Sequence, residues 1–178
     1  MRKKVFVLSG SPRAGGNCDL LCEAFARGAA EAGHEVVRMT VADREIGFCR
    51  ACYGCRGTGS CVLKDDMDEI LPAMLAADVL VLASPVYFYA ISAQMKAVID
   101  RTLPVWAALS DRELYYLMTA AAGSEGAMAE TLASFRGFAR CLKGSKEKGV
   151  LCATGVYEPG TVSGTDFVRQ AYEMGRSV

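Results

Sequence analysis

The residues best suited to chemistry form a loop at residues 9–17, with the sequence SGSPRAGGN. The loop follows the apolar run at residues 5–8 and precedes a helical pattern, so its glycines leave backbone N–H groups free at a helix N-terminus. Such an end favours negative charge, and phosphate above all. The side chains that could add donors or positive charge are those of Ser9, Ser11, Arg13 and Asn17. The loop therefore predicts a phosphate site, with an ordinary glycine-rich turn as the alternative.

The same loop excludes two nucleotide-binding motifs. Gly10 and Gly15 have the spacing of a P-loop, but Gly16-Asn17 stands where that motif has Lys-Ser/Thr, so no lysine can reach a triphosphate. The Gly-x-Gly-x-x-Gly pattern of dinucleotide sites is absent as well. What remains is a site for a single phosphate, and nucleotide hydrolysis is not expected.

A second candidate loop, SPVYFYAIS at residues 84–92, follows the apolar run at residues 78–83. Pro85 should end strand pairing, which places Tyr87, Phe88 and Tyr89 at the carboxyl end of a strand. Ligands bind at that edge in open α/β sheets. Flat aromatic side chains are suited to contact the flat ring of a ligand. The alternative is that these three side chains pack on the core or on a subunit interface.

Four of the eight cysteines lie close together in the sequence, and they are Cys49, Cys52, Cys55 and Cys61. Three thiolates at this spacing can bind one face of a [4Fe–4S] cluster, with the fourth returning from further along the chain. Zinc sites more commonly use two pairs separated by a dozen or more residues. A [4Fe–4S] cluster, zinc, and unmetallated or redox-active thiols all stay open as interpretations.

Composition excludes several other classes of function. Lys and Arg number 20 and Asp and Glu number 20, so the formal net charge is zero, which argues against nucleic acid as the main partner. No apolar run approaches the roughly 18 residues of a membrane span, and the apolar run at residues 5–8 is too short for a secretory signal. We expect a cytoplasmic protein without a membrane partner. His34 is the only histidine and has no evident partners for acid–base catalysis, so no hydrolase site is expected.

The elements that position these residues alternate between strand-like and helical patterns. Strands are expected at residues 5–8, 35–39, 78–83, 114–118 and 149–153. Helical patterns begin at Asn17, at Asp65 or Asp66, at Ser92, near Gly126 and near Phe167, and Pro72 should kink or split the second of them. Five strands separated by helices predict an α/β fold with a parallel sheet covered on both faces. We expect a single domain over residues 1–178, with a cysteine-rich insertion at about 46–64 and a helical appendage at about 156–178.

The two loops also carry a resemblance to a known family. Ser9 to Arg13 with Gly16-Asn17, and residues 84–88 with Met95-Lys96 and Asp100-Arg101, resemble the NADPH-dependent FMN reductase family of flavodoxin-like proteins. The resemblance extends over about residues 3–155, and the cysteine spacing is similar to that of the iron-sulfur flavoproteins in the same superfamily. It implies a doubly wound sheet of order 2-1-3-4-5, FMN at the carboxyl edge, and a homodimer or homotetramer that completes the site.

The resemblance further implies which residues bind the flavin. They are Ser9, Ser11, Pro12, Arg13, Gly16, Asn17, Cys18, Pro85, Val86, Tyr87 and Phe88, with Thr119, Ala120 and Gly123 in a third loop. Cys18 departs from the family, in which a hydroxyl residue is common at this position.

The implied reaction carries electrons from NAD(P)H through FMN to a quinone, a flavin or another small acceptor, with ferredoxin as a partner if a cluster is present. No side chain is expected to act as a catalyst, because the cofactor does the chemistry. A flavodoxin-like electron carrier is the alternative, disfavoured by the neutral charge, and a cysteine-based redox or zinc protein is a third interpretation.

Overall fold

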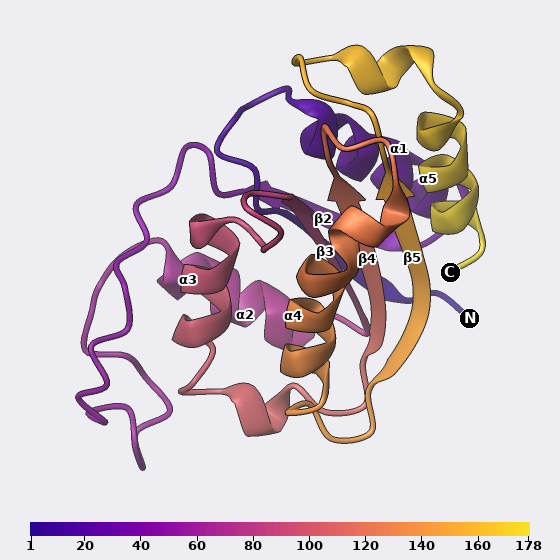
Figure 1. The fold of residues 1–178 in the computed structure, drawn as a ribbon. Coiled ribbons are helices and arrows are strands. Elements are labelled where there is room, and N and C mark those ends of the chain that lie inside the picture. The colour runs from indigo at the N-terminus through magenta and orange to yellow at the C-terminus, as the bar shows by residue number, and fades with distance from the viewer.

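Five strands form one parallel sheet in the computed structural model, which describes residues 1–178 (Figure 1). The sheet order is β2-β1-β3-β4-β5, and every neighbouring pair is parallel. The strands are β1 (Lys4–Ser9), β2 (Glu35–Thr40), β3 (Val79–Pro85), β4 (Glu113–Thr119) and β5 (Lys146–Ala153). The predicted strands and their predicted order are confirmed.

Helices cover both faces of the sheet (Figure 1). They are α1 (Asn17–Glu31), α2 (Met67–Ala76), α3 (Ala93–Arg101), α4 (Ala129–Ala139) and α5 (Asp166–Arg176), with 3₁₀ turns η1 (Trp106–Ala108), η2 (Glu125–Met128) and η3 (Thr161–Gly164). Alternate strand residues serve the two cores. Val5 and Val7 pack with α1 and α5, whereas Phe6 and Leu8 pack with α2, α3 and α4.

Two helices differ from expectation. Pro72 does not split α2, which runs unbroken from Met67 to Ala76. Met67, Ile70 and Met74 of this short helix are buried, and their packing holds the turn that the proline weakens. The helix expected from about Gly126 begins instead with η2 and becomes α4 only at Ala129.

A buried hydroxyl joins the first loop to the second. Ser92, the N-cap of α3, donates its Oγ–H to the carbonyl of Gly10 at 2.6 Å and accepts the Met95 N–H at 3.1 Å. The Gly10 N–H donates to the Ala83 carbonyl at 2.8 Å, and the Ser92 N–H donates to Ser84 Oγ at 2.8 Å. A Cβ at position 10 would lie 2.8 Å from both Ala83 O and Met95 Cβ, so glycine is required there.

A buried ion pair fastens the cysteine-bearing segment, residues 47–65, to α3. Arg101 is 1% exposed and donates to Asp65 twice, from Nη1 to Oδ2 at 2.6 Å and from Nη2 to Oδ1 at 3.0 Å. Nη1 also donates to the Gly47 carbonyl at 2.7 Å. The carboxylate accepts the N–H groups of Gly47 at 2.9 Å and Met67 at 3.1 Å. Both ends of the segment are therefore held by one guanidinium–carboxylate pair.

These contacts decide the charge state of Asp65. Burial raises the pKa of its carboxyl, but the hydrogen bonds from Arg101, Gly47 and Met67, together with the Arg101 charge, outweigh that effect. The net result is a pKa below the ordinary aspartate value. The carboxylate is thus ionised at neutral pH, as a buried arginine requires.

Ser92→Ala should destabilise the fold by about 1–2 kcal/mol, because it removes the α3 cap and leaves the buried Gly10 carbonyl without a donor. Urea unfolding followed by circular dichroism measures the change. Ser177→Ala is the matched control, since Ser177 is exposed and its hydroxyl donates only to the Met174 carbonyl at the end of its own helix. Equal losses for the two variants would contradict the linking role of Ser92.

Asp65→Asn should cost about 3 kcal/mol, because it leaves the Arg101 guanidinium buried without a counter-charge. Since the folded-state pKa is lowered, the pair contributes fully above the unfolded pKa of about 4 and is lost as the pH falls further. Unfolding at pH 3 and pH 7 should therefore show a smaller pH dependence in Asp65→Asn than in the unchanged protein. Asp166→Asn, at an exposed Arg169 pair, should change stability little. An unchanged acid dependence in Asp65→Asn would contradict this account.

Candidate functional site

Three loops meet at the carboxyl edge of the sheet, where β1, β3 and β4 end side by side. They enclose a cavity of about 120 Å³. Its lining residues are Ser11, Arg13, Asn17, Cys18, Pro85, Val86, Tyr87, Thr119, Ala120, Ala121, Val156 and Tyr157. The parallel sheet thus brings together residues that lie more than a hundred positions apart in the sequence.

One end of the cavity is suited to an anion. Gly16 is the N-cap of α1, and no side chain caps the helix. The N–H groups of its first turn, from Asn17 on, have no partner within the helix. Ser11 Oγ accepts the Arg13 N–H at 3.1 Å, which fixes the loop in its curled form. Open amides, a helix N-terminus and the Arg13 guanidinium together suit a phosphate.

Cys18 lies between this end and the third loop. Its Sγ shares a hydrogen bond of 3.1 Å with Thr119 Oγ1. Burial raises the pKa of the Cys18 thiol to about 12, despite the hydrogen bonds from Thr119. The thiol is therefore neutral at physiological pH and brings no negative charge beside an anionic ligand.

The other end of the cavity has an apolar wall and a strained turn. Tyr87 and Ala90 exchange two backbone hydrogen bonds of 3.0 Å, and the residues between them, Phe88 and Tyr89, have φ of 48° and 63°. This is a two-residue turn in left-handed backbone, which bulky side chains rarely adopt. Thr131 Oγ of α4 donates to the Tyr89 carbonyl at 3.1 Å and holds the turn. The turn leaves Tyr87 on the cavity wall and Phe88 fully exposed to solvent.

Some residues expected at the site do not line the cavity. Ser9 belongs to β1 and is fully buried, Phe88 faces solvent, and Gly123 is exposed in the third loop. Pro12 and Gly16 shape the first loop without lining the cavity.

Val156 and Tyr157 line the cavity although the sequence did not point to them. They follow β5, which ends at the same edge as the other strands, and this topology is the signal that could have found them.

The four clustered cysteines line a separate, small cavity of about 20 Å³ together with Arg101 and Pro104. Cys49 and Cys52 are exposed, whereas Cys55 and Cys61 are half-buried. Four thiols around one cavity are a donor set that suits an iron–sulfur cluster. However, no three metal-ligating side chains lie close enough to bind an ion in this arrangement. The fold gathers the cysteines without bringing their sulfurs to one point.

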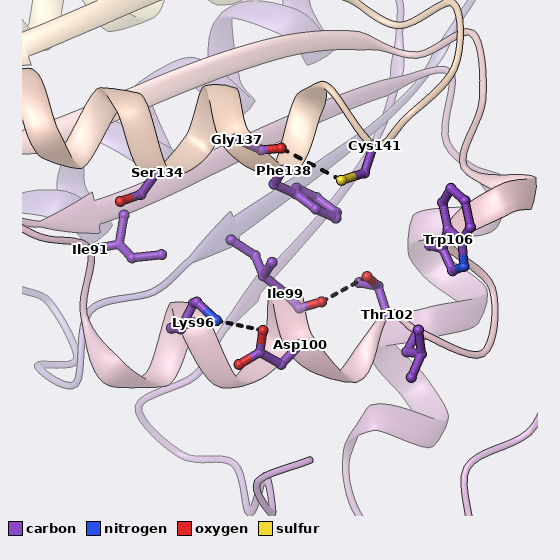
Figure 2. A pocket seen from close by; sticks show the side chains of 11 residues that line it. Ile91, Lys96, Ile99, Asp100, Thr102, Trp106, Ser134, Gly137, Phe138 and Cys141 are labelled. Atoms are coloured by element: carbon purple, nitrogen blue, oxygen red, sulfur yellow. Dashed lines mark hydrogen bonds and ion pairs between the residues drawn. The ribbon is translucent and has the colours of Figure 1, made fainter. Parts of the chain in front are cut away.

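The largest cavity, of about 510 Å³, lies between α3 and α4 (Figure 2). Figure 2 shows Ile99, Phe138 and Trp106 on its walls and the Lys96 ammonium paired with Asp100, at 2.6 Å. Its walls are mostly apolar, and its one cationic group is already paired. This groove therefore does not fit a phosphate-bearing ligand, in spite of its size.

No helix of the chain has the length and apolar character needed to cross a membrane.

Known proteins resemble the chain in sequence and in fold. Iron-sulfur flavoproteins of Methanocaldococcus jannaschii and Methanosarcina thermophila are 44% identical over 102 residues and 42% identical over 100 residues. These matches cover 57% and 56% of this chain but 53% and 52% of those proteins, so the chain spans about half the length of the curated relatives it matches. An azoreductase from Bacillus anthracis has the same fold, with a TM-score of 0.75 at 16% identity over 99% of this chain and 100% of that one.

The family model for NADPH-dependent FMN reductase matches residues 3–144. That range contains β1 to β4, the three loops of the cavity and the four clustered cysteines. The chain therefore belongs to the NADPH-dependent FMN reductase family, with the flavodoxin-like sheet that its resemblance implied.

Proposed function

We propose that the chain is an FMN-dependent oxidoreductase that takes electrons from NAD(P)H and passes them to a small acceptor such as a quinone or a flavin. The observation that carries the proposal is the 120 Å³ cavity, which joins an uncapped helix N-terminus to an apolar wall. A mononucleotide with a flat ring needs both of these features at once. Family membership supports the same reading.

The proposal gives the three loops different tasks. The amides at the start of α1, with Ser11 and Arg13, bind the phosphate, and Pro12 and Gly16 shape that loop. Pro85, Val86 and Tyr87 from the second loop, with Thr119 and Ala120 from the third, would hold the ring. Ser9 lies at the end of β1, directly before the first loop, and its side chain is buried away from the cavity.

Bound FMN would supply the redox chemistry, accepting hydride from the nicotinamide and giving electrons to the acceptor. The chain's own residues bind, orient and exclude water. Cys18 stays protonated and contributes no charge, and the apolar wall lowers the local dielectric around the ring. None of the lining side chains needs to move a proton for hydride transfer.

The cysteines extend the proposal to single-electron transfer. Cys49, Cys52, Cys55 and Cys61 would bind a [4Fe–4S] cluster, for which a ferredoxin-like protein is a suitable donor. The support is four thiols around one cavity and relatives named iron-sulfur flavoproteins. A cytoplasmic setting belongs to the proposal, because exposed thiols of this kind stay reduced there.

We further propose that a second copy of the chain covers the groove between α3 and α4, as a homodimer or part of a homotetramer. The groove is the largest cavity and is mostly apolar. Trp106 on its wall is 45% exposed. An apolar groove with a large exposed apolar side chain on its wall is typical of protein interfaces.

Anaerobic purification should yield a yellow-brown protein with one FMN per chain and with iron and acid-labile sulfide in equal amounts. Steady-state NADPH oxidation with an added quinone should proceed only when FMN is bound. Absence of turnover in the FMN-loaded protein would leave an electron carrier instead. Stoichiometric zinc without sulfide would end the cluster proposal.

Cys55→Ser provides the matched test of the cluster and should lose iron while keeping FMN. Cys141→Ser is its control, because Cys141 is exposed and lies at the end of α4, outside the cysteine motif. Equal iron content in both variants would contradict the assignment of the ligands.

Sedimentation at micromolar concentration should show a dimer or a larger assembly for the unchanged chain. Trp106→Glu should shift it to monomer, because the substitution buries a charge in an apolar contact. Val37→Glu, at an exposed apolar position on β2, is the control and should leave the assembly intact. A monomeric unchanged chain would rule out the second copy.

A further inference from the structure

Asn17, expected as a phosphate contact, directs its side chain at a different target. Its Nδ2 donates to the Glu158 carbonyl at 3.0 Å and to Thr161 Oγ1 at 3.4 Å. Its Oδ1 accepts the Val162 N–H at 3.1 Å. Asn17 is 8% exposed and Val162 is fully buried, so these hydrogen bonds are shielded from water. An amide has two donor hydrogens and one acceptor oxygen, and both of its groups are engaged here.

The partner of Asn17 is the segment of residues 155–165, called here the C-terminal strap. It leaves β5 and crosses the carboxyl edge of the sheet beside the start of α1 (Figure 1). The N–H groups of Gly155 and Val156 donate to the carbonyls of Ala122 and Ala120, each at 2.9 Å, which fastens the strap to the third loop. The Arg13 Nη1 donates to the Tyr157 carbonyl at 3.4 Å, a longer contact to the first loop.

The far end of the strap is held as firmly. The helix α5 follows it and packs directly on α1. A Cβ at Gly28 would collide with the Tyr172 carbonyl, and one at Gly175 would collide with the Phe25 carbonyl. The two helix backbones are therefore in direct contact, and the strap is stretched between two fixed elements, β5 and α5.

From these contacts we infer that the strap forms one wall of the cavity at its phosphate-binding end. Asn17 is a positioning residue that holds this wall in place and does not bind the phosphate. Val156 and Tyr157 carry the wall into the cavity. The inference rests on the proposed FMN function.

The test compares FMN with riboflavin, which lacks the phosphate, by titration of the flavin-free protein. A side chain that binds the phosphate stabilises bound FMN and not bound riboflavin. A residue that holds the cavity wall affects the binding of both flavins. Asn17→Ala should weaken FMN and riboflavin by the same factor, about tenfold for the loss of one or two hydrogen bonds. Amide hydrogen exchange at Val162 should rise in the same variant, since its acceptor has gone.

Two further variants keep the result interpretable. Ser11→Ala removes a hydroxyl from the phosphate loop and should weaken FMN selectively, without a change in Val162 exchange. Thr161→Ala leaves Asn17 in place and removes one of its partners, so it should repeat the Asn17→Ala pattern in milder form even if Asn17→Ala folds poorly.

A loss confined to FMN in Asn17→Ala, with Val162 exchange unchanged, would make Asn17 a phosphate ligand and overturn the inference. Failure of the unchanged protein to bind any flavin would remove the proposed function and this role of the strap with it. That failure is measured on the unchanged protein alone and is therefore distinct from the first outcome.

Discussion

The arrangement of the carboxyl edge depends on the hydroxyl of Ser92. Strands β1 and β3 lie side by side in the sheet, with Ser9, the last residue of β1, in register with Ala83, two residues before the end of β3. Beyond the backbone hydrogen bond from Gly10 to Ala83, pairing of these strands does not hold the first loop against the second. Ser92 Oγ, bonded to the Gly10 carbonyl while it caps α3, supplies the missing link. This hydrogen bond consequently fixes the distance between the anion-binding end and the apolar end of the cavity.

The fold was predictable from sequence because its determinants are local and repetitive. Apolar runs such as Val79–Ala83 are buried on both faces and mark parallel strands without any knowledge of their partners. The parallel arrangement then requires their carboxyl ends to share one edge, which brings Ser11, Tyr87 and Thr119 together. Pro72 does not split α2, because the cost of a proline is local whereas the burial that offsets it is tertiary.

The details of the site were less predictable for a physical reason. Asn17 has the residue type and position of a phosphate donor, and only a contact 145 positions away along the chain shows that its amide is already engaged. Ser9 likewise looks like a donor in a loop, but β1 extends one residue further than expected and buries its side chain. The spacing of the cysteines is compatible with a [4Fe–4S] cluster, zinc or free thiols, because spacing along the chain does not determine whether the sulfurs converge.

The C-terminal strap and the cysteine-bearing segment are fixed in different ways. The strap is fastened along its length, through Gly155, Val156 and the Asn17 side chain, so its shape is set by the chain alone. The cysteine segment is fastened only near its ends, by Arg101 and Asp65, and its middle keeps exposed thiols. A segment that forms the wall of a binding site should be ordered before the ligand binds, because ordering it on binding would lower the affinity. In the proposed cluster site, residues 47–65 would have to close around the cluster, and fixing both ends of the segment lowers the entropy lost on closure.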